Sequence, residues 1–168
     1  MTSTAAGALA PELRPASDED RELLYRIYAS TRTQELAIVS WDEPTKEAFL
    51  RMQFTAQDTC YRQTYPDASY DVVVAGEEPV GRLYVGRDAG ALRVIDVALL
   101  PEHRGRGIGT VLLGRVIDEA QALGIPVRLH VERHNPARAL YDRLGFRVIE
   151  DRGVYFLMER APYPNTAS

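Results

Sequence analysis

Three glycines stand close together in the segment PEHRGRGIGT, residues 101–110, which leads into an amphipathic stretch. Glycine has no Cβ atom, so all three can adopt a positive φ angle and let a ligand approach the backbone. The first N–H groups of a helix lack partners within it, and the positive end of the helix dipole attracts anions. With two arginines alongside, these features predict a pyrophosphate site. Its candidate residues are Arg104, Gly105, Arg106, Gly107, Ile108, Gly109 and Thr110.

The spacing of the glycines excludes two common phosphate-binding loops. A Walker-type loop needs Gly-Lys-Ser/Thr after four spacer residues, and the segment has no such lysine. A dinucleotide fingerprint needs a further glycine three places after the second, where the chain has Thr110 or Leu112, depending on the glycine pair chosen. A structural tight turn with solvated arginines is the remaining alternative to an anion site.

Polar side chains on expected strands are candidates for acid and base chemistry. Asp96 interrupts an apolar strand, where an unpaired polar group costs free energy, so it is either functional or part of a structural network. His130 and Glu132 lie on or just after the next strand. Each is either a proton acceptor or a solvated residue at the end of a strand.

Hydrophobic periodicity and boundary residues indicate the elements that position these side chains. Pro101 ends an apolar strand directly before the glycines, and Gly124 ends the helix that follows them. We expect strands at residues 13–16, 70–75, 80–85, 92–100, 126–131, 146–149 and 154–158. We expect helices from Ser17 to about residue 30, from Asp42 to Pro66, at 108–123 and at 136–144.

This order of elements predicts an α/β (α+β) fold with a mixed, mostly antiparallel central sheet of about six or seven strands, flanked by about four helices. Adjacent hairpins give antiparallel pairs, and the strand-helix-strand unit at 92–131 gives one parallel pair. We expect a single domain at residues 12–160, a disordered leader at 1–11 and a flexible tail at 161–168.

Composition limits the partners and the compartment. A net charge of −4 argues against nucleic acid, and no apolar run approaches the ~20 residues that span a membrane. The first ten residues lack the features of a secretory signal. Cys60 is the only cysteine, which excludes an intramolecular disulfide and a cysteine-rich metal site. We therefore expect a cytoplasmic protein without a metal.

Two segments resemble the GCN5-related N-acetyltransferase (GNAT) superfamily. Residues 97–109, VALLPEHRGRGIG, resemble its acetyl-CoA signature, Gln/Arg-x-x-Gly-x-Gly/Ala. Residues 135–146 resemble its second signature, Asn-x-x-Ala-x-x-x-Tyr-x-x-x-Gly-Phe, although the alanine is displaced by one or three places. Residues 13–16 are also similar to the family's first strand. The resemblance covers residues 13–159 and implies a GNAT-like fold with a splayed parallel strand pair.

The resemblance also implies roles for individual residues. The pantetheine arm of acetyl-CoA would bond backbone groups near Leu99 and Leu100 in the splayed gap, and Asn135 would contact the arm or cap a helix. Tyr141 matches the general acid for the departing thiolate, with core packing as its alternative, and Asp96 stands where some members carry an acid facing the acceptor. The first two helices and their connection would build the acceptor site. Its candidates are Arg32, Glu35, Trp41, His130 and Glu132.

The resemblance thus implies an enzyme that transfers acetyl from acetyl-CoA to a primary amine by direct attack in a ternary complex. A small-molecule amine is the favoured acceptor. The alternatives are a protein N-terminal or lysine acetyltransferase, a non-catalytic acyl-CoA-binding sensor, and a structural domain with an incidental glycine turn. The acceptor, the general base and the formation of a homodimer stay open.

Overall fold

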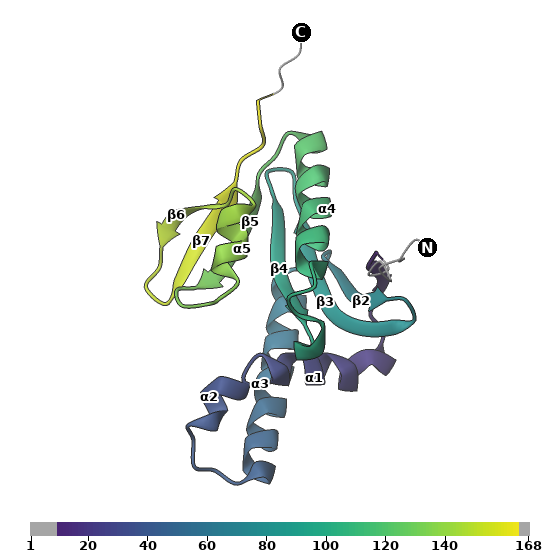
Figure 1. Cartoon of the computed structure of the whole chain (residues 1–168), viewed down its shortest axis with the longest axis vertical. Coiled ribbons are helices and arrows are strands. Elements are labelled where there is room, and N and C mark those ends of the chain that lie inside the picture. Colours follow the sequence, from purple (N-terminus) through teal and green to yellow (C-terminus); the bar gives the residue numbers. More distant parts are fainter. Residues whose placement is uncertain (1–9, 165–168) are drawn as a thin grey trace, which may run out of the picture.

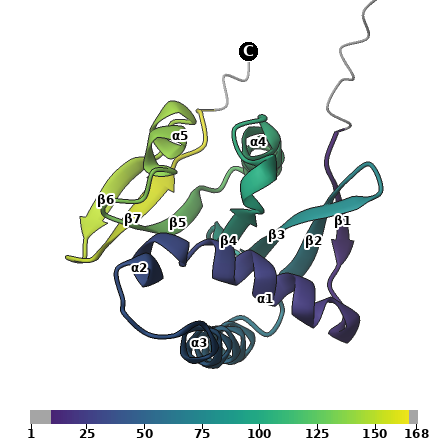
Figure 2. The ribbon, with the colours of Figure 1, turned by 60° about the horizontal axis from the view of Figure 1, so that its bottom comes forward.

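One seven-stranded sheet separates two layers of helices (Figure 1). The computed structural model describes residues 10–164. Helices α1 (Arg21–Ser30), α2 (Thr33–Ala37) and α3 (Glu43–Thr64) lie on one side of the sheet, and α4 (Ile108–Leu123) and α5 (Arg138–Arg143) on the other (Figure 2). The strands are β1 (Glu12–Pro15), β2 (Ser69–Ala75), β3 (Glu78–Arg87), β4 (Leu92–Leu99), β5 (Val127–Glu132), β6 (Arg147–Asp151) and β7 (Tyr155–Arg160).

The strand order is β1-β2-β3-β4-β5-β7-β6, and every neighbouring pair is antiparallel except β4 and β5. The parallel pairing of β4 and β5 is short, from Leu92 opposite Val127 to Val94 opposite Leu129. Past Val94 the two strands separate, while β5 continues to pair with β7 as far as Glu132. The predicted fold class is confirmed, including the splayed parallel pair.

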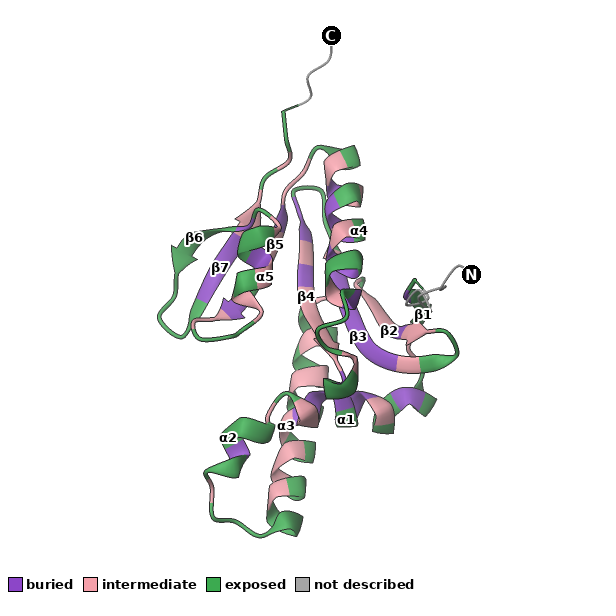
Figure 3. Cartoon of the chain, viewed as in Figure 1, coloured by how far each residue is buried: buried purple, intermediate pink, exposed green. Residues whose placement is uncertain are grey.

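Each face of the sheet has its own hydrophobic core. Between the sheet and α4, the core includes Leu112, Leu113, Leu129 and Met158. On the other face, α1 and α3 contribute Ile27 and Phe54 among others. Buried residues alternate with less buried ones along β5, while β6 has no buried residue (Figure 3). The best covered strand is β3, which is buried from Val80 to Val85.

The long helices begin and end where the sequence predicts. Asp42 caps α3, because its carboxylate accepts a hydrogen bond of 2.8 Å from the Thr45 N–H. Gly124 ends α4 in the left-handed conformation, with φ of +69°. In contrast, the five-residue helix α2 is missing from the sequence prediction, because only Leu36 in it is buried and one turn shows no periodicity.

Side chains of α4 bond to the backbone near both ends of the described residues. The leader, residues 1–11, lies mostly outside the described residues, but the Pro11 carbonyl accepts a hydrogen bond of 2.6 Å from Arg115. Within the predicted tail, the Tyr163 backbone forms hydrogen bonds of 2.8 and 3.1 Å with the Gln121 side chain. The chain is thus held as far as Tyr163, and residues 165–168 lie outside the described part. Among the described helices, none has the length and apolar character needed to cross a membrane.

Candidate active site

The glycine turn leads directly into the N-terminus of α4. Gly105 and Gly107 have φ angles of +73° and +83°, and no atom lies within 4 Å of where a Cβ would stand at either position. Gly107 precedes the helix without a side-chain cap, and the first helical bond runs from the Val111 N–H to the Gly107 carbonyl. The N–H groups of Ile108, Gly109 and Thr110 therefore have no acceptor inside the helix. This arrangement can hold an anion.

The third glycine, Gly109, differs from the other two in its backbone conformation. Gly109 has no positive φ, which corrects the expectation that all three glycines use the left-handed region. A Cβ there would lie 3.7 Å from the Leu140 side chain, an ordinary contact distance, so neither backbone conformation nor packing requires glycine at this position.

The two arginines of the turn also differ from each other. Arg104 donates hydrogen bonds of 2.9 Å to the Leu99 carbonyl and 3.2 Å to the Ser30 hydroxyl, so it joins the turn to β4 and α1. Arg106 is exposed and has no ion pair among the described residues. Of the two predicted cations, Arg106 is thus the one free to meet a phosphate.

The edge of β4 past Val94 carries backbone groups that β5 leaves unpaired. The Leu100 N–H donates to the Val80 carbonyl at 2.8 Å, and the Leu100 carbonyl accepts from the His103 N–H at 2.9 Å. Both backbone groups of Leu100 are therefore already bonded, which corrects the expectation that they face the gap. Because backbone direction alternates along a strand, the N–H groups of Leu99 and Val97 point away from β3, into the gap.

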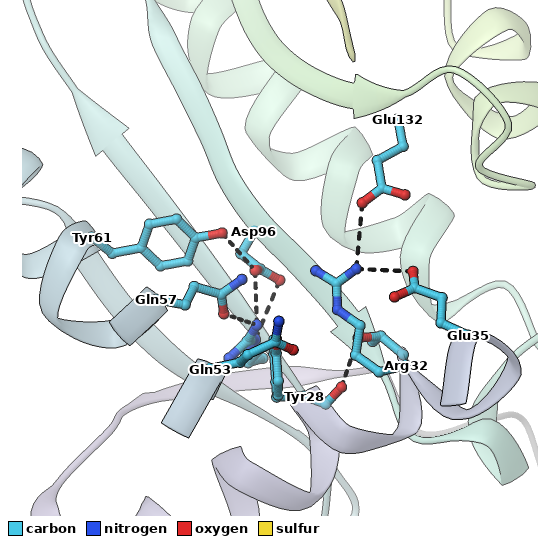
Figure 4. Close-up of polar contacts among 10 residues, drawn as sticks. Tyr28, Arg32, Glu35, Gln53, Gln57, Tyr61, Asp96 and Glu132 are labelled. Carbon is cyan, nitrogen blue, oxygen red and sulfur yellow. Dashed lines mark hydrogen bonds and ion pairs between the residues drawn. The ribbon is translucent and has the colours of Figure 1, made fainter. Parts of the chain in front are cut away.

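Asp96 belongs to a buried polar network. Arg82, which is only 2% exposed, donates hydrogen bonds of 3.2 and 2.8 Å to the two Asp96 oxygens (Figure 4). Two residues of α3 complete the network: the Tyr61 hydroxyl donates to Asp96 at 3.1 Å, and Gln57 accepts from Arg82 at 3.0 Å. Burial, together with the charge of Asp96, raises the pKa of Tyr61 well above its usual range. Of the two alternatives for Asp96, the structure shows the polar network.

A bulge in β4 explains why Asp96 reaches this network. Tyr84 pairs with Asp96 and Val85 pairs with Val94, so Ile95 is an extra residue in β4. Strict alternation would place Asp96 beside Leu92 and Val94, in the core under α4. The extra residue reverses the alternation and turns Asp96 toward α3, as bulges near functional sites commonly do.

Tyr141 lies on α5 in the core beside the gap. It is 7% exposed, and its ring packs edge to face on Phe146, with 5.8 Å between centroids. Burial, with a smaller contribution from the charge of Asp96, raises the pKa of Tyr141 to about 12. Its hydroxyl has no hydrogen-bond partner among residues 10–164. Tyr141 is therefore a protonated donor at neutral pH whose hydroxyl is free.

Asn135 stabilises the turn before α5, whose N-cap is Ala137. Its Oδ1 accepts a hydrogen bond of 2.9 Å from the Ala137 N–H, just before α5. The two N–H donors of its side-chain amide are not used by this contact, so the role toward a cofactor stays a prediction.

Three of the five predicted acceptor residues meet at one point. Arg32 lies 3.1 Å from a Glu35 oxygen and 3.5 Å from a Glu132 oxygen, which brings the α1–α2 connection against the end of β5 (Figure 4). The side chain of Glu132 is 41% exposed and that of Asp96 is 14% exposed. Glu132 thus carries the more accessible carboxylate.

The other two predicted residues have other contacts. Trp41 packs on Phe49 of α3, with 5.2 Å between ring centroids, and is 44% exposed. His130 lies between Arg93 and Arg152, at 3.3 and 3.2 Å from their guanidinium nitrogens. Sequence reasoning missed Arg82, Arg93 and Arg152. The only sequence signal for Arg82 is that it is a charged residue within an otherwise apolar strand. The following strand carries a second charged residue, Asp96, in the same kind of setting.

Comparison with known proteins defines the class. The model of the acetyltransferase (GNAT) family matches residues 22–146, and the chain belongs to this family. The resemblance found in the glycine and tyrosine segments is thereby confirmed.

The names of the curated relatives differ in what they act on. The chain is 34% identical over 64 residues (38% of its length) to a ribosomal protein bS18-alanine N-acetyltransferase of Haemophilus influenzae. It is 38% identical over 94 residues (54% of its length) to a mycothiol acetyltransferase of Corynebacterium glutamicum. These matches cover 44% and 32% of the relatives, so the chain spans less than half the length of the curated relatives it matches.

Solved structures match over the whole fold. PaiA N-acetyltransferase of Thermoplasma acidophilum, solved in complex with coenzyme A, superimposes with a TM-score of 0.69 at 24% identity, over 91% of this chain and 99% of that one. An acetyltransferase of Thermus thermophilus superimposes with a TM-score of 0.67 at 26% identity, over 92% and 99%.

Proposed function

We propose that this chain is an acetyl-CoA-dependent N-acetyltransferase that acts on a primary amine by direct attack in a ternary complex. The observation that carries the proposal is a juxtaposition. The anion site at the start of α4 follows the end of β4 at which β4 and β5 separate, and a free, protonated tyrosine hydroxyl lies beside that gap.

The described residues fit coenzyme A in three respects. Gly105 and Gly107 leave open space where side chains would stand, as a bulky pyrophosphate requires. The free N–H groups of α4 and the unpaired Arg106 supply its donors and charge. The edge of β4 that β5 leaves unpaired offers the N–H groups of Val97 and Leu99 and the Val97 carbonyl to an amide-bearing arm, as it would to an added strand, while the Leu99 carbonyl is bonded to Arg104. When bound, acetyl-CoA supplies an acetyl group activated as a thioester.

Three groups of the chain then have roles in the transfer. The Leu99 N–H donates a hydrogen bond to the carbonyl that is attacked and stabilises the negative charge that develops there. Tyr141 donates its hydroxyl proton to the departing sulfur. Glu132 accepts the proton of the amine, directly or through water, because its carboxylate is more exposed than that of Asp96 and makes one long ion pair with Arg32.

Asp96 has a supporting role in this proposal. Its two oxygens accept three hydrogen bonds from Arg82 and Tyr61, and its negative charge contributes to the raised pKa of Tyr141. Asp96 thus adds to the effect of burial on the proton donor. The single cysteine supports a cytoplasmic location as part of the proposal.

The acceptor in this proposal is a small-molecule amine. The matched relatives include one that acts on a protein and one named for a small thiol, so a protein acceptor is the second candidate. A non-catalytic acyl-CoA sensor needs the anion site but not the tyrosine, so the free Tyr141 hydroxyl favours the enzyme.

Release of free thiol from acetyl-CoA, measured with a panel of amines and peptides, tests the proposal. An acetyltransferase releases thiol with at least one amine class. A sensor releases no thiol, but its own melting temperature rises when coenzyme A binds. If millimolar coenzyme A leaves the melting temperature unchanged, the cofactor assignment is wrong.

A further inference from the structure

A basic cluster lies on the face of the sheet opposite α4 and α5, outside the residues assigned above to acetyl transfer. It consists of Arg93 on β4, His130 on β5 and Arg152 in the turn between β6 and β7. His130 and Arg152 are exposed, and Tyr155 beside them on β7 is 46% exposed. The strands β6 and β7 lie to the side of α1 and α3 (Figure 2), and the exposed side chains of His130 and Arg152 leave the cluster accessible to solvent.

The hydrogen bonding within the cluster is incomplete. The guanidinium of Arg93 lies 3.3 Å from Nδ1 of His130, and that of Arg152 lies 3.2 Å from Nε2. Guanidinium nitrogens only donate, and a neutral imidazole has one acceptor nitrogen and one N–H. In either tautomer one guanidinium therefore faces a second donor. A protonated imidazole would leave both of them facing donors.

The charges are also out of balance. Arg152 pairs with Glu150 at 3.0 Å, and the neighbouring Arg128 pairs with Glu159 at 2.7 Å. Arg93 has no carboxylate within ion-pair distance among the described residues. Burial and the charges of Arg93 and Arg152 lower the pKa of His130, which is the response of an imidazole held against cations. An anion with several acceptor atoms would accept hydrogen bonds from the surplus donors and would neutralise the surplus positive charge.

The cluster lies close to Glu132, the proposed proton acceptor. His130 and Glu132 are two residues apart on β5, so their side chains share one face and stand roughly 7 Å apart along the strand. Glu132 with Arg32 marks the place of the reacting amine. A ligand that reaches both points carries an amine at one end and an anion at the other.

We propose that Arg93, His130 and Arg152 form a subsite for a carboxylate on the acceptor. The acceptor is then a small primary amine with a carboxylate several bonds from the nitrogen. This inference rests on the proposed acetyltransferase function and adds the substrate class. In place of proton transfer, it assigns His130 to recognition, where its neutral ring accepts from one arginine and donates to the carboxylate.

Matched acceptors test the subsite directly. 6-Aminohexanoate and its amide differ only in the charged end, and their extended length suits the span from Glu132 to His130. We expect kcat/KM to favour the acid by about tenfold or more, as hydrogen bonds to a charged group do. The preference disappears in Arg93→Gln and Arg152→Gln, while the KM for acetyl-CoA does not change. Arg143→Gln is the control, because Arg143 is exposed on α5, on the other side of the sheet, and has no ion pair among the described residues.

A second measurement does not depend on turnover. N-acetyl-6-aminohexanoate, the expected product, is titrated while the imidazole signals of His130 are followed by NMR across pH. A bound carboxylate raises the pKa of His130 in the wild type and in Arg143→Gln, and fails to do so in Arg93→Gln. Melting temperatures near that of the wild type show that the variants are folded.

The outcomes separate the two proposals. Thiol release with no preference for the acid overturns the subsite and leaves the acetyltransferase intact. If no amine gives thiol release, the proposed function fails, and the NMR titration still decides whether the cluster binds a carboxylate. A His130 pKa that does not respond to the product overturns the subsite.

Discussion

Arg82 and Asp96 lie on neighbouring strands and are joined by two hydrogen bonds of 2.8 and 3.2 Å. The arginine is almost completely buried, so the removal of either partner leaves an uncompensated charge in a nonpolar environment. A pair of this kind costs about 3–5 kcal/mol when one partner is removed, and much less when both are replaced by apolar residues. The network therefore makes the two residues strongly dependent on each other.

We predict that Arg82→Met lowers the free energy of unfolding by about 3–5 kcal/mol and that Arg82→Met/Asp96→Leu recovers most of this loss. Urea unfolding of the two single variants and the double variant gives the coupling energy. The exposed pair Arg87 and Glu119 is the control, and Arg87→Met should cost at most about 1 kcal/mol. Additive effects of the two buried substitutions would contradict the prediction.

Gly107 stands directly before α4 and Gly114 lies within it, so the two glycines can be compared. Gly107→Ala strains a backbone with φ of +83°, and we expect a loss of stability of roughly 1–2 kcal/mol and a higher KM for acetyl-CoA. Gly114 lies within α4 with open space around it, so Gly114→Ala should stabilise the protein by up to ~1 kcal/mol and leave that KM unchanged. The KM of the two variants, measured at a saturating amine concentration, tests the anion site. Equal KM values would count against it.

Tyr141→Phe removes one hydroxyl and keeps the ring on Phe146. We expect turnover to fall by roughly 10²–10⁴-fold, with little change in the affinity for coenzyme A. Because the pKa of Tyr141 is raised to about 12, its proton is retained up to pH 10.5, and kcat should not fall between pH 9 and 10.5 through this group. Tyr163→Phe, at an exposed position after β7, is the control. Normal turnover in Tyr141→Phe would rule out its role as proton donor.

Glu132→Gln separates the two candidate carboxylates. If Glu132 accepts the amine proton, its substitution lowers kcat by at least about 100-fold without unfolding the protein. Glu35→Gln removes the other partner of Arg32 and should alter the KM for the amine more than kcat. Steady-state kinetics of both variants at several amine concentrations distinguish these effects. Full turnover in Glu132→Gln would return the role of base to Asp96 or to water.

The parts of the fold with strong local patterns could be predicted from the sequence. The helix at residues 108–123 follows from its apolar face and its bounding glycines, and the start of α3 follows from Asp42 and Pro44. Helix α2 could not be predicted, since one turn with a single buried leucine has no measurable period. The parallel strand pair could be expected from the helix between its strands.

The candidate site was less predictable, because partners across strands depend on register. The glycine turn and Tyr141 lie in local motifs that can be read along the chain. Asp96 could be singled out, but Arg82 is its partner only because of the bulge at Ile95. In the same way, Arg93 and Arg152 meet at His130 although the chain separates them by 59 residues (152 minus 93).

The bulge at Ile95 determines which face of the sheet each later side chain of β4 occupies. With Ile95, the carboxylate of Asp96 belongs to the acceptor side of the sheet and Val97 packs on the cofactor side. A regular strand that kept Ile95 without the bulge would exchange the two, placing the carboxylate in the core under α4 and Val97 on the face that carries Arg82. The bulge thus directs a charged side chain toward α3 and apolar side chains toward α4 on the two faces of one strand.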